Sequence, residues 1–174
     1  GSMAYSPSFS APVTRDDELE NLTGVSDEQA WYYPGTGLLR WGSSTPLPYH
    51  QWVYEGRDLR DQGVKVYVGK GIGFLGFSAG PTVHVIDYFA LSDHLLSHMP
   101  VKAKTNILIG HFARPIPKGY LQTLETNINQ IEDPGIAQYY EKISLITRGR
   151  IWSVERWEAI WKLNTGQYDY LLDQ

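Results

Sequence analysis

The sequence predicts an α/β protein of the mixed α+β kind, with a small sheet and a helical C-terminal half. Two short β-branched runs, 64–68 and 83–86, are typical of strands, and a third strand is predicted at 106–109. From residue 117 onward, apolar residues recur at helical spacing instead. No internal repeat is present. Strands mixed with helices, followed by helices alone, indicate a small sheet packed against helices.

Ahead of the sheet, the sequence predicts two helices separated by a loop. Ser26-Asp27-Glu28 is an N-cap signal for a helix over 29–33, which Pro34-Gly35 ends. Residues 36–48 are rich in Gly, Ser and Pro and are typical of a loop. Over 49–62, apolar residues recur at helical spacing among charged ones, and the next residue is a glycine. We therefore expect an amphipathic helix immediately before the first strand.

A glycine motif, Gly71-Ile72-Gly73-Phe74-Leu75-Gly76, stands directly after the first strand. This G-x-G-x-x-G spacing is typical of dinucleotide-binding loops, which open a crossover of about a dozen residues or more. Only six residues separate the motif from the second strand, and Gly80-Pro81 interrupts them. Asp87 follows too early for the acidic residue of that fingerprint, and no Walker G-K-[ST] is present. We expect instead a short glycine-rich helix over 72–79 between the strands, where glycines allow close backbone approach, and no cofactor.

Three helices are predicted in the C-terminal half. The first covers 117–126. Asp133-Pro134 begins the second, because the carboxylate can cap the helix and proline fits its first turn, and this helix extends to Gly149. The third begins at Ser153 and ends near Gly166. Its apolar residues share one face: Val154, Trp157, Ile160, Trp161 and Leu163.

Composition narrows the classes of partner and of chemistry. The net charge is −4, and no basic stretch is long enough to follow a phosphate backbone, so we expect no nucleic-acid partner. The chain has no cysteine, which excludes disulfides, thiolate metal sites and a cysteine nucleophile. It is rich in aromatic residues, with 12 Tyr and 6 Trp. These indicate either a core of large side chains or a surface that stacks on sugars or on a partner.

Acidic and histidine residues gather shortly after the second strand. Asp87 at the strand end is a candidate general base, with His94 beside it. His94 and His98 have the i, i+4 spacing of a helical metal site, although no H-E-x-x-H is present. The simpler interpretation is favoured: Asp93 caps a short helix over 93–99, the histidines are solvated, and no metal is bound.

Cationic residues form two further candidate sites. His111 and Arg114 flank the end of the third predicted strand, where they can hold a sugar hydroxyl or an anion, unless the arginine pairs with a nearby acid. Arg148 and Arg150 lie at the end of the second C-terminal helix. There they complement the helix dipole or, less simply, form an anion site.

Scattered residues over 24–163 resemble one protein family. They form these patterns: Gly73-Phe74-x-x-Phe77-x-x-Gly80-Pro81-x-Val83-x-Val85-x-Asp87, Ala90-Leu91-x-Asp93-x-Leu95-Leu96, Ile109-Gly110-His111-Phe112, Pro117-x-Gly119-Tyr120, Ile131-x-Asp133-Pro134, Tyr139-Tyr140 and Thr147-Arg148-Gly149. The pattern resembles the soluble C-terminal part of polytopic bacterial membrane glycosyltransferases of the GT-C type, which take sugars from polyprenyl-phosphate donors. The nearest relatives it suggests are arabinofuranosyltransferase-like envelope proteins, including the mycobacterial and corynebacterial terminal arabinofuranosyltransferase. His94 stands where relatives are expected to carry proline.

The resemblance implies a domain without chemistry of its own. In such enzymes the catalytic carboxylate lies on a loop near the first membrane helices, a region that this sequence lacks. The domain is then expected to lie at the extracytoplasmic face of the bacterial inner membrane, next to the transmembrane part of the same protein. There it covers the active site or holds the acceptor glycan. The candidate ligand-binding residues are Asp87, Asp93, His111, Arg114, Tyr120, Tyr140 and Arg148.

We expect residues 1–20 to be a cloning tag and a loose leader, and residues 21–174 to form one domain. Two other functions remain open. One is a stand-alone soluble enzyme that uses Asp87 with His94 or His111. The other is a structural or protein-interaction module.

Overall fold

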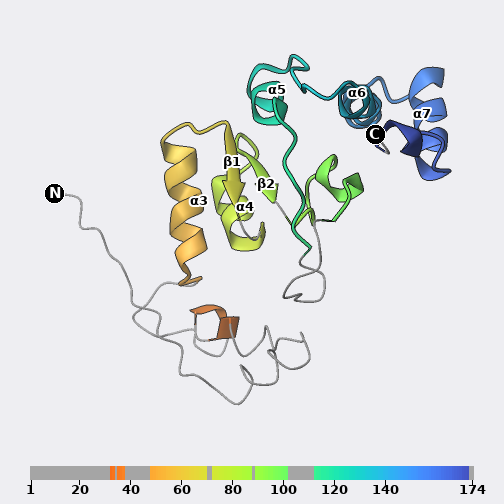
Figure 1. The fold of residues 1–174 in the computed structure, drawn as a ribbon. Coiled ribbons are helices and arrows are strands. Elements are labelled where there is room, and N and C mark those ends of the chain that lie inside the picture. The colour runs from red at the N-terminus through yellow and green to blue at the C-terminus, as the bar shows by residue number, and fades with distance from the viewer. Residues whose placement is uncertain are drawn as a thin grey trace. The chain divides into compact units, whose positions relative to one another are not determined.

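A computed structural model describes residues 32–33, 35–37, 48–69, 72–87, 89–101 and 112–172. Its helices and strands, from α3 onward, are α3 (Gln51–Asp61), β1 (Val66–Gly69), α4 (Gly73–Ala79), β2 (His84–Asp87), η2 (Leu96–His98), α5 (Tyr120–Thr126), α6 (Pro134–Arg148), α7 (Val154–Asn164) and η3 (Asp169–Leu171) (Figure 1). A parallel sheet, a short helix between its strands in sequence and a helical C-terminal half confirm the predicted fold class. Each element from α3 to α7 lies within about three residues of its predicted bounds.

The chain divides into two compact units. Of the described residues, the first unit contains 32–33, 35–37, 48–64, 72–83 and 112. The second contains 65–69, 84–87, 89–101 and 113–172. The predicted third strand at 106–109 and most of the predicted helix over 29–33 lie outside the described residues, and so does the predicted leader. In the part of the chain that is described, no helix has the length and apolarity needed to cross a membrane.

The first unit is built on the packing of α3 against α4. His50 caps α3, because its ring Nδ1 accepts a hydrogen bond from the Trp52 backbone N–H at 3.2 Å. A β-carbon on Gly56 of α3 would meet the backbone of α4 at the Leu75 carbonyl and, at 2.9 Å, the Ala79 nitrogen. Gly73, by contrast, faces open space. The prediction that glycines of the G-x-G-x-x-G motif provide close approach is therefore wrong for Gly73, and α3 supplies the glycine that does.

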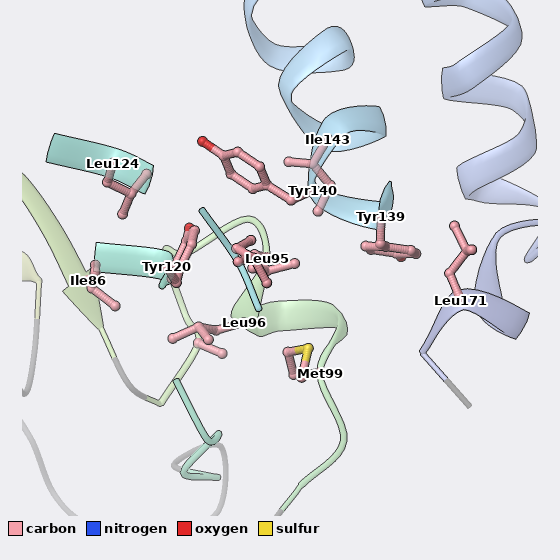
Figure 2. Close-up of a cluster of buried hydrophobic side chains, with 12 residues drawn as sticks. Ile86, Leu95, Leu96, Met99, Tyr120, Leu124, Tyr139, Tyr140, Ile143 and Leu171 are labelled. Carbon is pink, nitrogen blue, oxygen red and sulfur yellow. The ribbon is translucent and has the colours of Figure 1, made fainter. Parts of the chain in front are cut away.

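The second unit contains the sheet and the main core. β1 and β2 pair in parallel, from Val66 opposite His84 to Gly69 opposite Asp87. Buried side chains from β2, the segment around η2, α5, α6 and η3 gather into one cluster, which Figure 2 shows. Its members include Ile86, Leu95, Leu96, Tyr120, Leu124, Tyr139, Tyr140, Ile143 and Leu171. Each fully buried leucine in such a core contributes about 1.5–3 kcal/mol relative to an exposed one.

Local capping sets where the two long C-terminal helices begin. The Asp133 side chain accepts a hydrogen bond from the Ile136 N–H at 2.9 Å, and Pro134 occupies the first turn of α6. The Ser153 hydroxyl accepts one from the Arg156 N–H at 3.2 Å at the start of α7. Both predicted starts are confirmed, because each depends on a side chain only three residues from its donor.

Candidate functional site: a buried carboxylate network and an exposed aromatic face

Asp87 holds the turn that follows β2. Its side chain is fully buried, and the two carboxylate oxygens accept hydrogen bonds from the Phe89 N–H at 3.0 Å and the Leu91 N–H at 3.2 Å. Its carbonyl also accepts from the Ala90 N–H at 2.8 Å. Ala90 has a φ of 63°, a conformation that L-residues rarely adopt. The carboxylate therefore stabilises a strained turn, and each of its oxygens accepts at least one backbone N–H.

Asp93 begins the turn that leads into η2. One carboxylate oxygen accepts hydrogen bonds from the Leu95 N–H at 3.0 Å and from the Leu96 N–H at 2.8 Å. Asp93 therefore accepts backbone N–H groups at the predicted place, but the element is shorter than the predicted helix over 93–99: η2 is a 3-10 turn of three residues whose N-cap position is Leu95. Since Leu95 and Leu96 are fully buried, Asp93 also fixes two core side chains.

The same carboxylate joins three elements of the second unit. The Tyr120 hydroxyl at the start of α5 donates to both Asp93 oxygens, at 3.1 and 3.0 Å. The imidazole Nε2 of His84, the first residue of β2, lies 3.9 Å from one of them. That distance is too long for a hydrogen bond, so the His84 interaction is electrostatic and depends on protonation of the ring. Asp93 thus links β2, the η2 turn and α5.

Two pKa shifts follow from this network. Burial alone raises the pKa of Asp93, but His84, the Leu96 N–H and the Tyr120 hydroxyl stabilise the charged form more strongly, so the pKa lies below its usual value. The pKa of Tyr120 is raised well above its usual value, first by burial and then by the adjacent Asp93 carboxylate. The pair is therefore a charged carboxylate and a neutral phenol at neutral pH.

The other predicted site residues lie around this network or apart from it. The Tyr140 ring packs edge-on against Tyr120, with centroids 5.7 Å apart. Arg114 donates from Nε to the Met99 carbonyl at 2.9 Å, and Arg148 donates to the Asn127 side-chain oxygen at 3.1 Å.

Asp93, Tyr120 and Tyr140 therefore come together, whereas the contacts of Asp87 and Arg114 lie elsewhere. Arg148 contributes only an electrostatic interaction with Tyr120. His111 lies outside the described residues. The ligand-binding role of these seven residues stays a prediction.

Both histidines predicted to be solvated, His94 and His98, are exposed. The His98 ring also lies 5.5 Å from that of Tyr139. Partial burial lowers the pKa of His98. Within the described ranges, no three His, Asp or Glu side chains lie close enough together to hold a metal ion.

Sequence reasoning missed His84 as a member of the Asp93 network. The only available signal was one polar residue inside a β-branched run, between Val83 and Val85.

The outer side of α7 carries an exposed apolar surface. We call it the α7 aromatic face, and it consists of Ile151, Trp152, Val154, Trp157 and Trp161. The three indoles are 86%, 51% and 67% exposed, in sequence order. The Trp152 and Trp157 rings lie 6.4 Å apart and are inclined by 30°. The face is defined by side chains of the second unit alone.

The opposite side of α7 explains why this face remains outside. Ala159 is buried, and Ile160 and Leu163 are half-buried. Arg156 fastens the helix start, because its guanidinium donates to the Ile146 carbonyl at 2.7 Å and to the Ile151 carbonyl at 3.3 Å. The predicted apolar face of this helix is therefore divided: Ile160 and Leu163 turn inward, and the two indoles turn outward. The apolar residues from Trp157 to Leu163 span a wider arc of the helix surface than one neighbouring helix covers, so part of this arc stays exposed.

Charges of both signs border the α7 aromatic face. Glu158 and Lys162 form an i, i+4 ion pair on α7, with Nζ 2.6 Å from Oε1. This hydrogen bond lowers the pKa of Glu158. Arg150 and Glu155 are also exposed beside the face. Together with Arg156, which donates to the Ile151 carbonyl, these groups give the border charges of both signs.

A hollow of about 340 Å³ lies against the polar face of α3. Its lining residues are Gln51, Tyr54, Glu55, Asp58, Leu59 and Gln62. All of them come from one side of one helix, and a convex helix surface does not by itself enclose a ligand. We therefore give this hollow less weight than the α7 aromatic face.

Comparison with known proteins adds no relative to this picture. No protein-family description, no curated protein and no solved structure matches the chain.

Proposed function

We propose that the chain is a non-catalytic extracytoplasmic domain of a polyprenyl-phosphate-sugar-dependent membrane glycosyltransferase of the arabinofuranosyltransferase-like kind. In this proposal the domain lies at the bacterial inner membrane, beside the transmembrane part of the same protein, and holds the acceptor glycan for it. The observation that carries the binding role is the exposure of three indoles on the α7 aromatic face.

Exposing indoles to water is energetically unfavourable, so clustered exposed indoles are unusual where they have no binding role. Each indole presents a large apolar area to water, and clustered exposed apolar side chains mark interaction sites in soluble proteins. An indole is also flat and rigid, so it stacks on the apolar face of a sugar ring with little loss of conformational entropy. Its N–H is available to a hydroxyl group. These properties favour a carbohydrate as the occupant.

The buried acids support a binding domain rather than a catalyst. A general base must reach the proton that it removes, directly or through one water. Asp87 and Asp93 are both buried, and each of their carboxylates accepts backbone hydrogen bonds. Using either acid in catalysis would require the turn that it holds to open. The glycosyltransferase assignment itself is supported by the residue pattern over 24–163.

An NMR titration of the ¹⁵N-labelled domain with arabinan and mannan oligosaccharides tests the proposal. We expect shifts at the indole N–H signals of Trp152, Trp157 and Trp161, and loss of these shifts in Trp157→Ala. Phe77→Ala is the matched control, because it removes an exposed aromatic ring from α4. A flat response at millimolar sugar, or transfer or hydrolysis of a sugar by the domain alone, would overturn the proposal.

A second function, protein interaction, is favoured by Ile151 and Val154. These aliphatic side chains extend the α7 aromatic face but offer no ring on which a sugar stacks. They suit an apolar protein surface, such as the transmembrane part of the same protein, and the domain would then cover its active site. Pull-down of that part by the wild-type domain, with no shift on addition of sugar, would select this function over glycan binding.

A further inference from the structure

We infer that the α7 aromatic face binds the interior of a linear, uncharged oligosaccharide, with one sugar unit on each indole, rather than a chain end. The inference rests on the proposed function and deepens it. It names the number of sugar units bound, the part of the glycan chain that is bound and the charge of the glycan, each of which follows from a different feature of the face.

The number of sugar units follows from the number and the spacing of the rings. Trp157 and Trp161 are four residues apart, so they lie on the same side of α7 and about 6 Å apart along its axis. This advance is comparable to the length of one sugar residue in an extended chain. Trp152 precedes the N-terminus of the helix, and its ring lies 6.4 Å from that of Trp157, so we refer to the three rings in sequence order as a row. The three exposed rings offer three stacking positions that follow one another along the chain.

Binding of the interior of a glycan chain follows from the exposure of the first and last rings of the row. Recognition of a chain end requires a wall that stops the chain and polar groups that bind its last hydroxyls. The two outer rings, Trp152 and Trp161, are the more exposed ones, at 86% and 67%, and the middle ring of Trp157 is 51% exposed. A row that is most open at its two ends allows a chain to continue past both of them.

The lack of charge follows from the border of the face. The charged residues next to the face are of both signs: Arg150, Arg156 and Lys162 are positive, Glu155 and Glu158 are negative, and Glu158 and Lys162 are already paired at 2.6 Å. An anionic lipid surface or a strongly charged peptide is favoured by a border of one sign. Here a bilayer of anionic lipid would bring its phosphates toward Glu155 and Glu158. Hydroxyl groups, by contrast, accept from the cations and donate to the carboxylates, so an uncharged polyol matches the border.

The test is a length series measured by isothermal titration calorimetry. Linear arabinofuranose and mannose oligomers of increasing length, methylated at the reducing end, are titrated into the wild-type domain. We expect affinity to rise with each unit up to the trisaccharide and then to level off. Each stacked ring is expected to contribute about threefold to tenfold in affinity. Trp161→Ala should shift the plateau to the disaccharide, Trp161→Phe should restore part of the loss, and Phe77→Ala should leave the series unchanged.

Other outcomes separate this inference from the proposed function. A monosaccharide that binds as tightly as the longer chains would overturn the inference and leave glycan binding standing. Preference for an anionic oligosaccharide over its neutral counterpart would overturn it as well. Failure of every sugar to bind, or binding only to vesicles containing phosphatidylglycerol, would overturn both the inference and the proposed function.

Discussion

The hydroxyl of Tyr120 donates to both carboxylate oxygens of Asp93, at 3.1 and 3.0 Å, although 27 positions separate the two residues in the chain. Both side chains are buried, and the carboxylate also caps the turn into η2. One ion therefore fixes the start of α5 against the segment that carries Leu95 and Leu96. In a buried setting, a hydrogen bond to a charged group is among the stronger ones that a protein forms.

Tyr120→Phe should destabilise the fold by about 1.5–3 kcal/mol, because it removes a donor from a buried charge and leaves the ring in place. Urea denaturation followed by circular dichroism measures the change. Tyr140→Phe is the control: it removes a phenolic hydroxyl that does not contact Asp93, from a buried tyrosine whose ring packs against Tyr120. If the free energy of unfolding falls by the same amount in both variants, the hydrogen bond between Tyr120 and Asp93 contributes no more than the hydroxyl of Tyr140.

The pKa of Asp93 gives the fold a predictable sensitivity to acid. Its pKa in the folded protein lies below the reference value of 3.8. Asp93 therefore stabilises the fold above the unfolded pKa, and this contribution is lost as the pH falls through the folded pKa. We expect the free energy of unfolding to fall below about pH 4, and the fall to be shallower in Asp93→Asn.

Denaturation curves from pH 2 to pH 7 check this, with Asp58→Asn as a control that removes an exposed carboxylate from α3. Asp93→Asn should also be less stable than wild type at pH 7, by about 1–3 kcal/mol. Parallel acid limbs in wild type and Asp93→Asn would show that other carboxylates cause the acid sensitivity.

Gly56→Ala should separate α3 from α4. The added β-carbon would meet the Leu75 carbonyl and, at 2.9 Å each, the Ala79 nitrogen and the Ser78 β-carbon. Two of these three atoms are backbone atoms, which move only if a helix moves, so we expect a loss of about 1–3 kcal/mol. Gly73→Ala is the matched control in α4, because its β-carbon faces open space and alanine favours helix by about 0.5–1 kcal/mol. Thermal unfolding of the two variants should therefore shift in opposite directions.

Whether a feature of the fold or of the site could be predicted from the sequence depends on how far apart in the chain its interacting residues lie. The starts of α6 and α7 were predictable, since Asp133 and Ser153 cap donors three residues away. The capping role of Asp93 was predictable for the same reason. Its link to Tyr120 was not, because nothing local in either segment specifies the other.

The residues against which each helix packs could not be predicted from the sequence, for a similar reason. Gly56 interrupts a helical pattern and suggests only a weak helix position, yet it lies at the closest approach of α3 to α4. The apolar pattern of α7 indicated which residues share a face but not which part of it is covered. That division is decided by α6 and by the Arg156 hydrogen bonds, which come from tertiary structure.

The α7 aromatic face should be removable without loss of the fold. Trp161→Ala deletes an indole that is 67% exposed, so the free energy of unfolding should change by less than about 1 kcal/mol. Leu95→Ala, which deletes a fully buried side chain, should cost about 2–5 kcal/mol. Urea denaturation of both variants gives the comparison. A large loss in Trp161→Ala would mean that the indole stabilises the domain itself, and a stability near wild type together with lost glycan binding would mean that it is retained for its ligand.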